Sequence, residues 1–160
     1  MTSLSSIVTG STMSAPRVLL YGPAGVGKTT FGASAPAPIF IQTEDGADVV
    51  GADRFPVAES YQDVETAIGT LAKEDHQYGT VVVDSLDWLE TLIWQRVCQV
   101  HKCNSIEDLG YGKGYVHAVD IWRSFLDGLN HLRKNKGMAV IMLAHSHIKR
   151  FEDPAGEAYD

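Results

Sequence analysis

The chain has 160 residues, of which 44% are hydrophobic and 21% charged, and its formal net charge is −7. This length fits one domain with its own core, and the composition excludes a disordered or low-complexity protein. The negative net charge argues against broad coating of nucleic acid, because such binding is driven by abundant Lys and Arg, so any DNA contact is expected to be local.

The longest apolar runs, such as MAVIMLA at 138–144, are far shorter than the ~20 residues of a membrane-spanning helix. No basic segment followed by an apolar one marks an export signal at the N-terminus. The two cysteines suit a reducing compartment. We therefore expect a cytoplasmic protein with no membrane partner.

Residues 1–15 are rich in Ser and Thr without apolar periodicity, which predicts a disordered tail before a single domain at 16–160. Within the domain, apolar segments of strand length alternate with helical patterns. Strands are predicted at 17–21, 38–42, 80–84 and 138–144. Helices are predicted from Lys28, over 60–75 with Ser60 as N-cap, over 85–103, and over 115–136, with a polar loop at 104–114.

The predicted strands are continuous apolar runs, which is typical of strands that are covered on both faces. With helices between them they predict an α/β fold with a mainly parallel sheet flanked by helices. Ligands of such sheets lie at the carboxyl ends of the strands. The segments directly after the strands are 22–29, 43–45, 84–85 and 145–147.

The sequence GPAGVGKT at 22–29 matches the phosphate-binding pattern G-x-x-x-x-G-K-[ST]. Its glycines let backbone N–H groups surround a phosphate, and the helix that follows presents its positive N-terminus to the same anion. Lys28 is expected at the β- and γ-phosphates of ATP, and the Thr29 hydroxyl at Mg²⁺. The predicted cofactor-binding residues are Gly22, Pro23, Ala24, Gly25, Val26, Gly27, Lys28, Thr29 and Thr30.

Two carboxylates at other strand ends complete a predicted catalytic set. Asp84 ends an apolar strand, which is where nucleoside triphosphatases place the carboxylate that holds the metal or its water shell. An Asp that only caps the next helix would have the same sequence pattern. Glu44 directly follows FIQT (40–43) at the end of the strand at 38–42 and is the candidate that orients or deprotonates the attacking water. Asp45 is the alternative base, whereas Asp48 reads as a solvated turn residue.

His145 ends the last strand and is expected to touch the γ-phosphate and report its loss, with His147 as the alternate. The pair also has the spacing of two metal ligands on one strand face, but it lacks a third ligand. The segment CQVHKC at 98–103 contains Cys and His, the residue types that bind zinc, but it has no fourth ligand. Two core thiols and an exposed His are therefore the favoured interpretation.

Together these motifs resemble the RecA-like core of P-loop ATPases. The closest resemblance is to phage-borne nucleotide-binding proteins that act in single-strand annealing and recombination, and it covers most of residues 17–150. The stretches that carry it are LLYGPAGVGKTTFGASAP, IFIQTEDGAD, TVVVDSLDWL, LGYGKGY and VIMLAHSHIKR.

This resemblance implies that Glu44 is the catalytic glutamate and Asp84 the metal-associated aspartate. It implies a longer protein whose sheet continues beyond this chain, and rings or filaments in which a neighbouring subunit supplies a basic residue. Lys149 and Arg150 are the only late candidates for that residue. The implied partners are single-stranded DNA, further copies of the protein and a single-strand-binding protein, in the host cytoplasm if the protein is phage-encoded.

The Gly-rich segment LGYGKGYVH at 109–117 has two interpretations. One is a flexible connector. In the other, Tyr111 and Tyr115 stack on bases of single-stranded DNA while Lys113 contacts phosphates.

The function favoured by these patterns is a DNA-stimulated ATPase that couples nucleotide state to single-stranded DNA binding, annealing or recombination. The ATPase activity of this short chain by itself is expected to be weak. A small-molecule or nucleotide kinase is an alternative, but the scattered arginines do not form the clamp that such enzymes need. A nonhydrolytic nucleotide-gated scaffold is another alternative, which would need Lys28 but not Glu44.

Overall fold

The computed structural model describes residues 14–44 and 51–146. Its centre is a five-stranded sheet in which every strand pair is parallel, with the order β1-β5-β4-β2-β3. The predicted fold class is therefore confirmed. Most of the predicted disordered tail at 1–15 lies outside the described residues. The strands are Arg17–Gly22 (β1), Pro38–Gln42 (β2), Asp53–Arg54 (β3), Thr80–Asp84 (β4) and Ala139–His145 (β5).

Within residues 14–44 and 51–146, four α-helices and one short 3₁₀ helix connect the strands. The second α-helix has the predicted Ser60 N-cap, which forms a capping box with Asp63. The helices are Lys28–Ala33 (α1), Tyr61–Lys73 (α2), Leu86–His101 (α3), Ile106–Leu109 (η2, the 3₁₀ helix) and Lys113–Asn135 (α4). In the described ranges, no helix combines the length and apolar character needed to cross a membrane.

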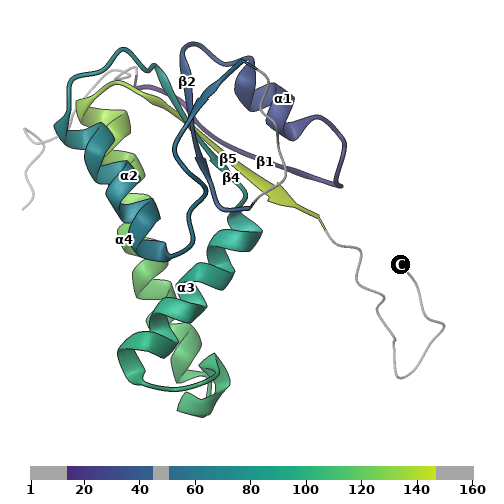
Figure 1. Ribbon diagram of the computed structural model, residues 1–160, viewed down its shortest axis with the longest axis vertical. Coiled ribbons are helices and arrows are strands. Elements are labelled where there is room, and N and C mark those ends of the chain that lie inside the picture. The colour runs from purple at the N-terminus through teal and green to yellow at the C-terminus, as the bar shows by residue number, and fades with distance from the viewer. Residues whose placement is uncertain (1–13, 45–50, 147–160) are drawn as a thin grey trace, which may run out of the picture.

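Helices cover the two faces of the sheet unequally, with α2, α3 and α4 on one face and the short α1 on the other (Figure 1). Alternate residues of β4 supply the two cores: Val81 and Val83 face the large helical layer, and Val82 faces α1. Gly32 of α1 lies directly against Val82 and Phe40, where an added Cβ would meet their side chains. Because both faces are covered, the central strands need the continuous apolar runs seen in the sequence.

The strand register gathers the ends of β1, β2, β4 and β5 at one edge of the sheet. Gly22 of β1 pairs with His145 of β5, and Asp84 of β4 pairs with both Gln42 and Leu143. The polar residues that end or follow these strands are thereby brought together.

The helices α3 and α4 extend past the sheet as a hairpin, at the bottom of Figure 1. The predicted loop at 104–114 is wrong in two respects, because it contains the 3₁₀ helix η2 and because α4 begins at Lys113 rather than Tyr115. Gly114 permits this early start: a Cβ there would collide with the backbone oxygen of Ile106, so only glycine allows the first turn of α4 to pack on η2. The short strand β3 is also absent from the predicted elements.

Candidate nucleotide-binding site

The phosphate-binding loop connects β1 to α1 at the carboxyl edge of the sheet. Gly25 and Gly27 have φ angles of 78° and 93°, a conformation that residues with a Cβ rarely adopt. A Cβ added at either position would meet no atom within 4 Å, so the loop backbone faces open space there. This combination of an accessible backbone and an adjacent helix N-terminus suits an anionic phosphate group.

The Lys28 side chain lies in the first turn of α1 and is only 6% exposed. Its ammonium donates hydrogen bonds to the backbone oxygens of Gly22 and Pro23, at 2.9 and 3.0 Å. A buried ammonium needs such partners. These contacts keep the charge inside the loop, where a bound phosphate would meet it.

Thr29 and Asp84 bring the loop and β4 into direct contact. The Thr29 hydroxyl donates a 2.8 Å hydrogen bond to the Asp84 carboxylate. Mg²⁺ is usually held in nucleotide sites by one or two protein oxygens together with phosphate oxygens and water, so this pair fits that ion. The peptide bond between Asp84 and Ser85 is cis.

Burial raises the pKa of Asp84, and the nearby Glu44 carboxylate raises it further. The Thr29 hydrogen bond and the charges of His145 and Lys28 act in the opposite direction without cancelling the effect. The ionised form of Asp84 is therefore less favourable in the folded protein than in water, and a bound cation would favour it.

Glu44, predicted as the catalytic base, lines the same cavity as the phosphate-binding residues. The cavity measures about 340 Å³. Its walls come from the loop, α1 and the ends of β2, β4 and β5. The lining residues are Gly25, Gly27, Lys28, Thr29, Thr30, Glu44, Asp84 and His145. Five of the predicted loop residues and all four predicted catalytic residues thus surround one space, although their roles remain predictions.

His145 is held by a residue that sequence reasoning missed. One carboxylate oxygen of Asp87, in the first turn of α3, accepts from the His145 backbone N–H at 2.7 Å and contacts ring Nδ1 at 3.0 Å. Because an ionised carboxylate only accepts hydrogen bonds, Nδ1 is assigned as carrying a proton. Burial by itself raises the pKa of Asp87, but the hydrogen bonds from His145 outweigh burial and lower it.

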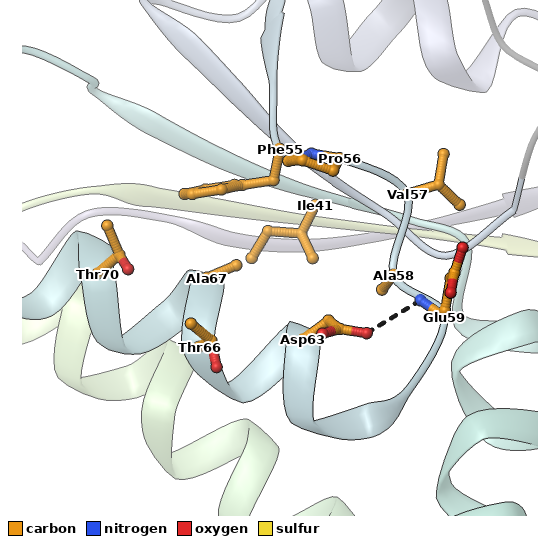
Figure 2. Close-up of a pocket in the computed structure, with 10 residues that line it drawn as sticks. All are labelled: Ile41, Phe55, Pro56, Val57, Ala58, Glu59, Asp63, Thr66, Ala67 and Thr70. Carbon is orange, nitrogen blue, oxygen red and sulfur yellow. Dashed lines mark hydrogen bonds between the residues drawn. The ribbon is translucent and has the colours of Figure 1, made fainter.

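A second cavity, of about 390 Å³, lies between α2 and the segment 55–59 (Figure 2). Its apolar side chains include Ile41 and Phe55, and its polar ones include Glu59 and Asp63. Asp63 already accepts hydrogen bonds from the backbone of Glu59 and Ser60. This cavity is slightly larger than the first, but no Lys, Arg or His of the described chain lines it, so it does not suit phosphate.

The predicted DNA-contact residues lie at the tip of the α3–α4 hairpin. Because α3 has 16 residues, it places the tip about 24 Å from the end of the helix that lies next to Asp84. Tyr111 is fully exposed, and Lys113 is exposed in the first turn of α4. Tyr115 already has partners, since its hydroxyl contacts Glu107 at 3.2 Å and its ring packs edge-on against Trp94.

Several sequence candidates lie outside the described residues: Asp45, Asp48, His147, Lys149 and Arg150. Among the residues that the structure does describe, no three His, Cys, Asp or Glu side chains are placed to hold a metal ion by themselves. The segment at 98–103 therefore shows no zinc site. Its thiols are half-buried rather than in the core, and His101 is exposed as expected.

Comparison with known proteins agrees with this geometry. The model of the AAA domain family matches residues 14–160. The SPbeta prophage-derived uncharacterized protein YorG of Bacillus subtilis (strain 168) is 24% identical over 148 residues, which cover 89% of this chain and 43% of that protein. The chain thus spans less than half the length of this relative. On the family match, which covers all described residues, the chain belongs to the AAA domain family of P-loop ATPases.

Proposed function

We propose that the protein binds ATP with Mg²⁺, hydrolyses it, and couples the nucleotide state to single-stranded DNA binding in annealing or recombination. The observation that carries the ATPase part is the single cavity lined by Lys28, Thr29, Glu44, Asp84 and His145. A loop that only held a phosphate would not need the two additional carboxylates at neighbouring strand ends.

Each residue of the cavity has a distinct part in this proposal. Lys28 binds the β- and γ-phosphates, and the loop backbone N–H groups orient them. Thr29 and Asp84 would hold Mg²⁺, and the ion would supply positive charge next to the phosphate oxygens. Glu44 accepts a proton from the attacking water or orients it.

His145 contacts the γ-phosphate in this proposal, and Asp87 keeps its ring in place. With Nδ1 bound to Asp87, the Nε2 side of the ring is the one left to meet a ligand. Asp87 belongs to the first turn of α3, so a displacement of His145 would reach the helix that leads to the hairpin tip.

The DNA part of the proposal is supported by the hairpin tip. Tyr111 is fully exposed beside Gly110 and Gly112, and Lys113 adds a positive charge in an acidic chain. Aromatic stacking on single strands does not require a strongly basic protein. The relative's prophage origin is compatible with this role. Self-association into rings or filaments, and contact with a single-strand-binding protein, belong to the same proposal.

Binding of MgATP to the full-length protein and to Lys28→Ala tests the nucleotide site by isothermal titration calorimetry. Removing the ammonium should abolish binding, because no other strong cation lines the cavity within the described chain. Parental affinity in Lys28→Ala would refute the phosphate-loop assignment.

Phosphate release with and without single-stranded DNA tests the coupled reaction. We expect hydrolysis that is stimulated by the DNA and that rises faster than linearly with protein concentration. Binding of ATP without turnover would favour the nucleotide-gated scaffold, and phosphate transfer to a small acceptor would favour a kinase.

A further inference from the structure

The side chain of Thr43 joins the ends of β2 and β4 beyond their regular pairing. Its hydroxyl donates to the backbone oxygen of Ser85 at 2.6 Å and accepts from the Ser85 backbone N–H at 3.0 Å. The Thr43 backbone N–H donates to the oxygen of Asp84 at 2.9 Å. Thr43 is 5% exposed and Ser85 is fully buried, so water does not compete well for these bonds.

The residues joined in this way are the neighbours of the two carboxylates in the nucleotide cavity. Thr43 directly precedes Glu44, and Ser85 directly follows Asp84. A hydroxyl can donate and accept at the same time, so one small side chain satisfies both backbone groups of Ser85. The β-branched Thr side chain is also stiff about its first torsion, which makes the connection rigid.

We propose that Thr43 is a positioning residue for ATP hydrolysis, which fixes the Glu44 carboxylate relative to Asp84 and the phosphate-binding loop. This inference rests on the proposed function, because it assumes that Glu44 acts on the attacking water. Thr43 is the last residue before Glu44 and is held by three hydrogen bonds. Loss of the hydroxyl frees the end of β2 from Ser85 while leaving Lys28 and Thr29, which bind the nucleotide, untouched.

The expected consequence is a separation of turnover from binding. A displacement of about 1 Å in a catalytic group reduces the rate by as much as about 100-fold. Thr43→Val keeps the volume and branching but has no hydroxyl, so its kcat should fall roughly 10- to 100-fold while its Kd for MgATP stays at the parental value. Thr43→Ser keeps the hydroxyl and should restore most of the parental kcat.

Ser85 provides a matched control at the same depth. Its own hydroxyl oxygen is buried and has no hydrogen-bond partner within the described part of the chain. Ser85→Ala therefore removes a buried hydroxyl without breaking the contacts between Thr43 and the Ser85 backbone, and it should hydrolyse ATP like the parent.

The test measures kcat and the Kd for MgATP and for ADP in the full-length parent, Thr43→Val, Thr43→Ser, Ser85→Ala and Glu44→Gln. Parental kcat in Thr43→Val would overturn the positioning role. So would a loss of kcat that Thr43→Ser does not restore. Binding of ADP reports whether a variant is folded, so Thr43→Ala replaces Thr43→Val if the latter does not bind ADP. If neither variant binds ADP, Thr43 serves only folding and the positioning role is overturned.

Glu44→Gln separates this proposal from the one on which it rests. A slow Glu44→Gln beside a fully active Thr43→Val refutes only the role of Thr43. A fully active Glu44→Gln, or a parent without ATPase activity, refutes the proposed catalytic function and the role of Thr43 together.

Discussion

Replacement of Asp84 by asparagine should make the nucleotide-free protein more stable while it damages the magnesium site. The substitution Asp84→Asn keeps the side-chain shape and an oxygen that accepts the hydrogen bond from Thr29. What it removes is a negative charge on a side chain that is only 6% exposed and lies beside Glu44. The conflict between stability and function at this residue follows from its position in the cavity.

The sign of the pH dependence follows from the raised pKa of Asp84. Burial is its main cause, and it means that the folded protein binds the proton more tightly than the unfolded chain does. The free energy of unfolding therefore falls as the pH rises from the ordinary Asp value of 3.8 through the raised value. Removing an unfavourable buried charge is worth on the order of 1 kcal/mol, which raises the Tm by about 2–4 °C for a chain of this size.

Thermal unfolding followed by circular dichroism, without nucleotide and at several pH values, measures this difference. The Tm of Asp84→Asn should exceed that of the parent at neutral pH, and the two should converge as acid protonates Asp84. Asp63→Asn is a control of opposite sign, because hydrogen bonds from Ser60 lower the pKa of Asp63, so its replacement should reduce stability at neutral pH. A less stable Asp84→Asn, or a Tm difference that does not depend on pH, would refute the reasoning.

The hairpin tip offers two further predictions. Gly114→Ala forces a Cβ into the backbone of Ile106 and should lower the free energy of unfolding, measured with urea, by about 1–3 kcal/mol. Gly69→Ala in α2 is the control: its Cβ has open space around it, so this variant should raise the free energy of unfolding by up to about 1 kcal/mol. In fluorescence anisotropy with a labelled oligonucleotide, Tyr111→Ala should weaken single-strand binding by about 1–3 kcal/mol at every salt concentration. Lys113→Ala should mainly reduce the salt slope, by about 0.7 for one phosphate contact. Parental binding by both variants would show that the tip is only a connector.

The sequence predicts β1, β2, β4 and β5 well because their patterns are local, whereas the two-residue β3 has no such pattern. The predicted bounds of β2 and β4 are those that the structure has, since a continuous apolar run flanked by turn residues marks a doubly covered strand. Their parallel arrangement then places the residues after each strand at one edge, so Lys28, Glu44 and Asp84 are expected to meet. The cavity that they line agrees with this expectation.

The contacts that sequence reasoning missed depend on residues far apart in the chain. Asp87 and His145 are separated by 58 residues, and Thr43 and Ser85 by 42, so no local pattern pairs them. Asp87 reads as an ordinary acidic residue in the first turn of a helix. The early start of α4 is missed for a similar reason, because Gly114 reads as a loop residue until its contact with Ile106 is known.

The most direct test of the ATPase account is the turnover of Glu44→Gln compared with the parent, in the full-length protein with Mg²⁺, ATP and single-stranded DNA. Gln keeps the size and hydrogen-bonding capacity of Glu but cannot accept a proton from water. The account predicts that the variant binds ATP as tightly as the parent and hydrolyses it about 10²- to 10⁴-fold more slowly, the usual contribution of a general base. Parental turnover in Glu44→Gln would contradict the account.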